Sequence, residues 1–183
     1  MLLFTISIFF ITEVRLSTPS LENKPHTSVT TLNEAPDTTI TELVSTTFDT
    51  NGDLKYTLSS PHLTHYPTAD ITHIDSPHVL LYQRDKSPWE IRSNQGTLKK
   101  DDLLLLLGNV QVKGRTGSEK TPLTMNTEAL ELHTNEKYAK TSVLVNIQTP
   151  RNTIGALGMK ADFLNSTIAL LSQVKGKHEP LND

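Results

Sequence analysis

The chain has no cysteine among its 183 residues, few aromatic residues (5%) and no strong excess of one charge. The absence of cysteine excludes disulfides, thiolate metal sites, iron–sulfur clusters and cysteine nucleophiles. A net charge of −3 excludes the basic surface typical of nucleic-acid binding. Hydrophobic residues make up only 36% of the chain, which favours a thin core between two β layers over a helical bundle.

Long apolar runs are missing except for a short one at the N-terminus. Residues 1–11 are apolar apart from Thr5 and Ser7. This run is about half the length of a membrane-spanning helix, and it lacks the basic start and the cleavage site of a signal peptide. We interpret residues 1–15 as a membrane anchor, either a short one or one whose first residues are missing. A buried first strand is the alternative, because Phe4, Ile6 and Ile8 alternate with a period of two.

The next segment, residues 16–41, is rich in Thr, Ser and Pro and has no apolar period. Such a segment buries too little apolar area to offset the chain entropy lost on folding. We therefore expect a disordered tether at 16–41, a folded domain at 42–178 and a short tail at 179–183.

From residue 42 onward, alternation with a period of two predicts strands. Asn51-Gly52 favours a type I′ hairpin turn between strands at 44–48 and 54–58. Turns are also expected at Asn94–Gly96 and Gly114–Gly117. Short strands at this spacing indicate an all-β sandwich, jelly roll or rolled sheet, with helices at 128–133 or 161–171 as the main alternative. The other expected strands are 71–74, 79–82, 89–93, 103–107, 109–113, 123–127, 130–133, 143–149, 158–163 and 167–171.

A weak internal repeat aligns Ser93–Leu98 with Thr127–Leu132 and Gly158–Phe163. Repeated hairpins predict a sheet with two open edges, which can dock other sheets; chance similarity between hairpins is the alternative. The run Leu103–Leu107 puts apolar side chains on both faces of a strand. One face fits the core, and the other needs a second layer, a partner or an apolar ligand.

Residue patterns for catalysis are missing. His62 and His65 are three residues apart and would point to opposite faces of a strand, which favours a surface role over a zinc site for the four histidines in this part of the chain. Glu119 stands where a phosphate-binding loop needs glycine. We predict no enzyme activity, no metal and no cofactor.

Several segments resemble one known family. They are Asn51–Tyr66, Ser76–Val79, Pro88–Ser93 and Leu105–Val112. All are similar to the LptC family, the membrane-anchored periplasmic component of the lipopolysaccharide export bridge of Gram-negative bacteria, and the resemblance covers about residues 1–178. It implies a twisted, V-shaped β-jelly roll of two antiparallel sheets behind an N-terminal anchor helix, with a groove that holds acyl chains.

The resemblance also implies a set of lipid-binding positions. Alignment to the family gives Leu43, Ile74 and Ile168, and the alternation of apolar residues adds Val145, Ile147, Met159 and Phe163. Ordinary core packing is the alternative role for each. Two departures from the family are the short anchor and Thr149, where a strand often carries glycine.

For function, the resemblance implies that the chain takes lipopolysaccharide from the inner-membrane ABC transporter complex (LptB, LptF and LptG) and passes it to the soluble bridge protein LptA. The transporter would dock at Leu43–Phe48 and LptA at Thr167–Val174. A homodimer could use the same edges. The implied location is the inner membrane, with a single pass and most of the chain in the periplasm.

A secreted β-sandwich for glycan binding or adhesion is the alternative function. Such a module stacks sugars on exposed aromatic residues. The chain has only one Trp, four Tyr and five Phe, which favours the lipid-transport interpretation.

Overall fold

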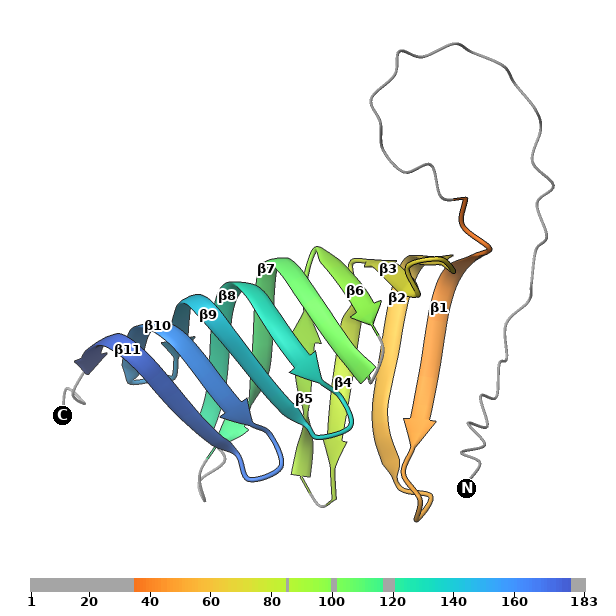
Figure 1. The fold of residues 1–183 in the computed structure, drawn as a ribbon. Helices are drawn as coiled ribbons and strands as arrows, with labels where there is room; N and C mark the ends of the chain where they lie inside the picture. The colour runs from red at the N-terminus through yellow and green to blue at the C-terminus, as the bar shows by residue number, and fades with distance from the viewer. Residues whose placement is uncertain (1–34, 85, 100–101, 117–120, 179–183) are drawn as a thin grey trace, which may run out of the picture.

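The computed structural model describes residues 35–84, 86–99, 102–116 and 121–178, and in these residues the chain forms a single antiparallel sheet of eleven strands (Figure 1). The expected anchor, most of the tether and the tail lie outside the described residues. The strands are β1 (Thr38–Phe48), β2 (Leu54–Tyr66), β3 (Ile71–Asp75), β4 (His78–Gln83), β5 (Lys86–Arg92), β6 (Gln95–Lys99), β7 (Leu103–Thr116), β8 (Thr121–His133), β9 (Tyr138–Gln148), β10 (Asn152–Asp162) and β11 (Thr167–His178).

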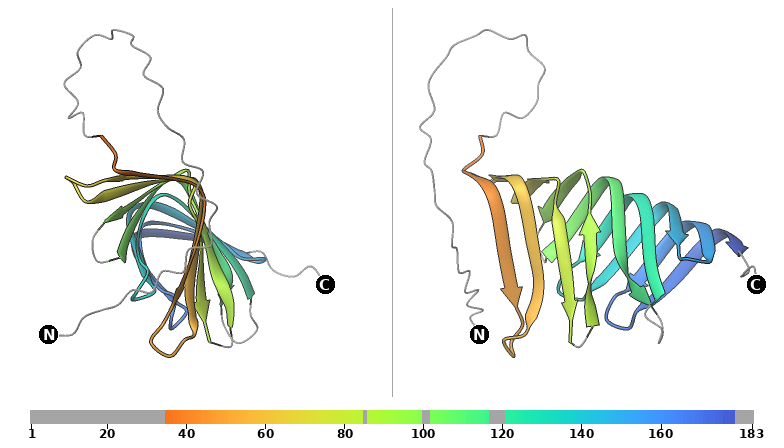
Figure 2. Two further views of the ribbon diagram at one scale, coloured as in Figure 1. Left: turned by 90° about the vertical axis from the view of Figure 1, so that its right-hand side faces the viewer. Right: turned by 180° about the vertical axis from the view of Figure 1, so that it is seen from behind.

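The sheet divides into two layers because β2 and β7 each pair with different strands along their two halves. The first half of β2 pairs with β4 and the second half with β3. The first half of β7 pairs with β6 and the second half with β5. We call the layer that contains β3 and β6 layer 1 and the layer that contains β4 and β5 layer 2. The other long strands run through both layers, which diverge in a V (Figure 2, left).

The layers meet at a crease where the long strands bend. Residues with positive φ lie at these bends: Glu42 in β1, Gly108 and Asn109 in β7, Gly158 in β10 and Gln173 in β11. The pairing registers of β7, β10 and β11 shift beside them. Such a register shift marks a β-bulge, in which one strand has an extra residue relative to its partner. A bulge bends the strand and increases its twist. The crease is therefore built from a line of bulges that crosses neighbouring strands.

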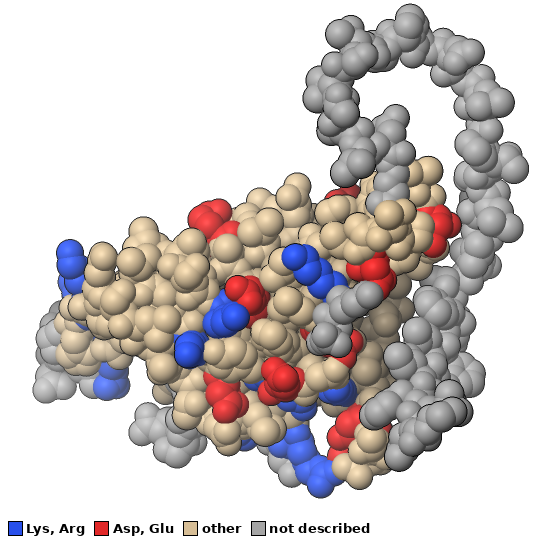
Figure 3. All heavy atoms as spheres, viewed as in Figure 1, with Lys and Arg blue, Asp and Glu red and all other residues tan. Residues whose placement is uncertain are grey.

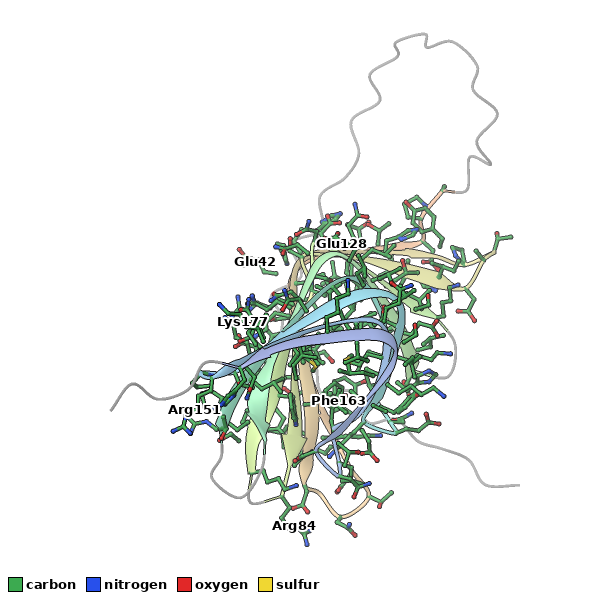
Figure 4. The ribbon with its side chains drawn as sticks, turned by 90° about the vertical axis from the view of Figure 1, so that its left-hand side faces the viewer. Glu42, Arg84, Glu128, Arg151, Phe163 and Lys177 are labelled. Carbon is green, nitrogen blue, oxygen red and sulfur yellow. The ribbon has the colours of Figure 1, made fainter. Side chains whose placement is uncertain are left out.

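The core lies between the layers as one cluster of buried apolar side chains. Side chains alternate between the two faces of a strand, and those on the inward face of each strand form this cluster. In the leucine run of β7, Leu104 and Leu106 are buried in the cluster, whereas Leu107 is 49% exposed on the outer side. Figure 4 views the sheet from its C-terminal end, with Phe163 between the layers and Glu128 outside the bend.

Most expected strands are present, but with longer bounds. The expected strands at 103–107 and 109–113 are the two halves of β7, and those at 123–127 and 130–133 are the two halves of β8. The residues considered for helices belong to β8, β10 and β11 and the turn between the last two. Bulges at the crease explain the difference, because they interrupt the alternation without ending the strand.

Two differences concern the N-terminal hairpin. First, β1 begins at Thr38, inside the expected tether, because Thr38–Thr41 pair with β2 through the backbone and Ile40 packs on the core. Second, the type I′ turn was wrong. Gly52 has a positive φ but Asn51 does not, and the Asp49 carboxylate accepts hydrogen bonds from the backbone N–H groups of Asn51 and Asp53.

Two expected turns lie partly in strands, although Asn94 forms a bend before β6 and Gly117 lies outside the described residues. Gln95 and Gly96 begin β6, and Gly114 lies inside β7. A Cβ on Gly114 would overlap the ring of Trp89, and one on Gly96 would lie 3.0 Å from Cγ of Pro77. Both glycines therefore allow close packing within the sheet, which a local sequence pattern cannot distinguish from a turn.

Candidate functional site

The seven lipid-binding candidates predicted from the sequence all lie in or against the interior cluster. Ile168 is partly buried and packs on the cluster. The other six are at most 5% exposed: Leu43, Ile74, Val145, Ile147, Met159 and Phe163. The set runs from β1 at one end of the sheet to β11 at the other. These side chains stabilise the fold when they pack on one another, and they would contact acyl chains if the layers parted.

An aromatic pair joins the two layers inside the cluster. Trp89 of β5 and Phe163, which follows β10, have ring centroids 5.1 Å apart at an interplanar angle of 48°. Both are almost fully buried. The backbone at Gly114 leaves room for the Trp89 ring. Aromatic pairs at this separation are favourable beyond the area they bury, so the pair holds layer 1 against layer 2.

Three lysines link the layers at the open side of the V, which we call the mouth. Nζ of Lys137, in the β8–β9 turn, donates to the Tyr82 carbonyl at 2.5 Å. Nζ of Lys86 donates to the Leu164 carbonyl at 3.4 Å. Lys55 donates to the side-chain oxygen of Asn135. Figure 1 shows the β8–β9 turn crossing in front of β4. The mouth is thus bridged along its middle.

Two depressions lie along the crease. One, of about 300 Å³, is lined by Glu42, Leu43, Val44, Ser59, Ser60, Pro61, Ser76 and His78. The other, of about 480 Å³, is lined by Asn109, Asn126, Thr127, Glu128, Leu144, Val145, Asn146, Gly155, Ala156, Gln173 and Lys175. Most of these side chains are polar, and only a few belong to the interior cluster. Neither depression offers a long apolar trough, so acyl chains would need the layers to separate.

The sheet has an open edge at each end. Among the described residues, β1 pairs only with β2, and β11 pairs only with β10. Apolar side chains stand exposed on both edge strands: Val44 and Phe48 on β1, and Leu171 and Val174 on β11. Unpaired edges with exposed apolar side chains favour the addition of a further strand.

A charged contact holds the start of β1 to β2. The His65 ring lies 2.8 Å from the Asp37 carboxylate and 3.6 Å from that of Asp70. The hydrogen bond to Asp37 raises the pKa of His65, and the same bond lowers the pKa of Asp37. The Asp37 N–H also donates to the His65 carbonyl at 3.2 Å. This contact holds the residue before β1 to the end of β2.

The three mouth lysines were missed by the sequence interpretation. Each contacts a residue more than 50 positions away in the chain, and no local pattern encodes such a contact. Within the described residues, no group of three or more His, Asp or Glu is placed to hold a metal ion. No helix of the described part is long and apolar enough to cross a membrane.

Comparison with known families identifies the chain. Residues 1–179 match the family model described as "Lipopolysaccharide-assembly, LptC-related". The chain belongs to the LptC family. It is therefore involved in lipopolysaccharide transport, in a family of bridge components rather than enzymes. A comparison with curated proteins gave no match.

The fold is similar to that of another bridge protein. A crystal structure of LptH from Pseudomonas aeruginosa, described as the LptA-homologous periplasmic component of the lipopolysaccharide transport device, aligns with a TM-score of 0.54. The alignment covers 68% of this chain and 95% of LptH at 8% identity. At this identity the likeness concerns the fold, and it agrees with the β architecture expected for an LptC family member.

Proposed function

We propose that this LptC family member holds the acyl chains of lipopolysaccharide between its two layers and passes the lipid along the sheet. The observation that carries the proposal is the apolar interior cluster, which contains six of the seven candidate residues and against which the seventh, Ile168 of β11, packs. The donor would be the inner-membrane transporter complex of LptB, LptF and LptG. The acceptor would be the soluble bridge protein LptA.

Physical chemistry supports an apolar route for this lipid. Each methylene group kept out of water is worth about 0.8 kcal/mol, so several acyl chains cannot cross an aqueous space uncovered. The interior side chains already bury one another. When lipid enters, contacts between the layers are replaced by contacts with acyl chains. The free-energy cost of separating the layers is therefore low once the lipid is present.

The two open edges bind different partners in this proposal, and this sets the direction of lipid transfer. We assign the β1 edge, with Val44 and Phe48 exposed, to the transporter, and the β11 edge, with Leu171 and Val174 exposed, to LptA. Backbone pairing at each edge would continue the sheet into the partner. A homodimer would occupy the same edges and would compete with these partners.

The proposed location follows from family membership. Residues 1–15 would anchor the chain in the inner membrane by a single pass, and the β domain would lie in the periplasm. Glycan stacking, the alternative function, gains no support from the only Trp, because Trp89 is buried in the interior.

Photo-crosslinking in cells tests the proposal. A photoreactive residue at Ile168, which packs on the interior cluster, should give an adduct with lipopolysaccharide that depends on ATP hydrolysis by the transporter. Ala169 is the matched control, since it is the next residue on β11 and is exposed. Equal adducts at both positions, or an adduct only at Ala169, would contradict lipid transport through the interior.

A further inference from the structure

We infer that Lys55, Lys86 and Lys137 form a binding site for the phosphate groups of an amphiphile whose acyl chains occupy the interior. The inference rests on the function proposed above and adds a headgroup site to it. It begins from the mouth, where these three lysines bridge the layers.

The three lysines converge on one part of the mouth. Lys86 pairs with Gln83 across the β4–β5 hairpin, next to Tyr82, which accepts the hydrogen bond from Lys137. The Lys137 carbonyl in turn accepts from the N–H of Phe163, the residue before Leu164. Lys55 reaches the same turn as Lys137 through Asn135. These contacts link the β8–β9 and β10–β11 turns to the β1–β2 and β4–β5 hairpins, which places the three ammonium groups along one opening.

The acceptors of these lysines are neutral. Two are backbone carbonyls and the third is an amide oxygen. None of the three lysines takes part in the ion pairs recorded among the described residues. The present bonds are charge-assisted only through the ammonium donors, whereas a phosphate would add the attraction between two opposite full charges. An anion would therefore compete well for these donors.

Three carboxylates close to the mouth already have partners. Asp53 forms an ion pair with Arg84. Figure 4 shows Arg84 at the tip of the β4–β5 turn. Glu136 lies 3.6 Å from the ring of His133. Asp162 accepts two hydrogen bonds from Asn165, which lower its pKa. Figure 3 shows both basic and acidic side chains around the middle of this face.

The position beside the aromatic pair defines the class of ligand. Phe163 precedes Leu164, the acceptor of Lys86, and Trp89 lies three residues after Lys86; both rings are buried and in contact. A ligand that fits carries phosphate next to acyl chains, as phosphorylated lipid A does. Phosphate oxygens would draw the lysines from their neutral acceptors, and this exchange would release the bridge across the mouth as the acyl chains enter.

Binding measurements on the full-length protein test the inference. Trp89, the only Trp, lies in the interior and reports lipid entry by fluorescence. The probes are phosphorylated lipid A, the same lipid A after enzymatic dephosphorylation, and inorganic phosphate. The test variant is Lys86→Gln with Lys137→Gln, in which glutamine can still donate to the carbonyls. The control variant is Lys113→Gln with Lys160→Gln, two exposed lysines on other parts of the sheet.

We expect the wild type and the control to bind phosphorylated lipid A about tenfold or more tightly than the dephosphorylated lipid. The test variant should lose that difference and retain its melting temperature. Equal wild-type binding of both lipids would overturn the inference and leave the proposed function standing. Full displacement of the lipid by inorganic phosphate would also overturn it, because the site would then be a free-anion site. Failure to bind either lipid would overturn both proposals.

Discussion

Trp89 and Phe163 come from different layers of the sheet, and their rings meet in the interior with centroids 5.1 Å apart. Trp89 extends from β5 in layer 2 over the backbone of Gly114, and Phe163 follows the end of β10 in layer 1. The mouth lysines lie just outside this pair. This aromatic pair therefore lies where the core, the mouth and the proposed lipid route meet.

Truncating Phe163 should destabilise the domain strongly. Phe163→Ala leaves a cavity against Trp89, and for a side chain this buried the expected loss is about 3–5 kcal/mol in the free energy of unfolding. Urea denaturation followed by Trp89 fluorescence measures it. Phe163→Leu keeps most of the volume and should cost clearly less. A loss below about 1 kcal/mol for the alanine variant would show that the layers are joined elsewhere.

Adding one methyl group to Gly114 should also destabilise the fold. The Cβ of Gly114→Ala overlaps the Trp89 ring, and relieving such overpacking costs about 1–3 kcal/mol. Gly155→Ala is a matched control in β10, since a Cβ there meets nothing within 4 Å. Thermal unfolding of the two variants compares them. Equal melting temperatures would contradict the close packing of Trp89 on β7.

Attachment of the first residues of the domain should depend on pH through His65 and Asp37. The folded-state pKa of His65 is raised by Asp37, so its contribution is complete below about pH 6.5 and is lost as the pH rises through the folded-state value. The pKa of Asp37 is lowered, so its contribution is present above about pH 4 and disappears in stronger acid. The contact should therefore be firmest between these limits.

NMR titration of the His65 ring measures this effect. We expect a pKa above the usual histidine value in the wild type and a lower pKa in Asp37→Asn, in which only Asp70 still raises it. Hydrogen exchange of the Asp37 amide, which is bonded to the His65 carbonyl, should quicken as the pH rises beyond what the intrinsic rate explains. An identical His65 titration in both proteins would refute the contact.

A charge introduced at Ile168 should impair transport more than folding. Ile168 packs on the cluster from an edge strand and is only partly buried, so Ile168→Arg can extend its charged end to water. Lipopolysaccharide delivery should fall, whereas Ala169→Arg on the exposed side should behave as the wild type. If Ile168→Arg unfolds the domain, its circular dichroism will show this, and the residue then serves the core alone.

A negative charge introduced at one edge of the sheet should weaken binding of one partner only. Val44→Asp and Val174→Asp change side chains that are 68% and 53% exposed, so stability should hardly change. We expect Val44→Asp to weaken capture of the transporter complex and Val174→Asp to weaken capture of LptA, each in a pull-down with purified partners. Loss of both partners in either variant would contradict the assignment of one edge to each.

The sequence predicted the fold class and the interior face well, because alternation places side chains on one side of a strand independently of distant contacts. Ile147 and Met159 were found in this way, and both are buried. The weak repeat also has a structural basis. Ser93–Leu98, Thr127–Leu132 and Gly158–Phe163 all begin near the crease and continue into layer 1.

Features that depend on distant contacts could not be predicted. Gly114 resembles a turn residue locally, and only the ring of Trp89 explains its place within β7. Lys137 lies in an ordinary turn, yet its ammonium group reaches Tyr82 across the mouth. Thr38–Thr41 carry no apolar pattern, and they form a strand because β2 offers a free backbone edge.

The central claim is that acyl chains enter between the layers, and a distance measurement across the mouth tests it most directly. The chain has no cysteine, so Thr50→Cys in layer 2 and Glu136→Cys in layer 1, both exposed, would carry the only spin labels. Pulsed electron paramagnetic resonance would compare the label distance with and without bound lipopolysaccharide. The account predicts a longer distance when the lipid is bound. An unchanged distance with lipid demonstrably bound would place the acyl chains outside the interior.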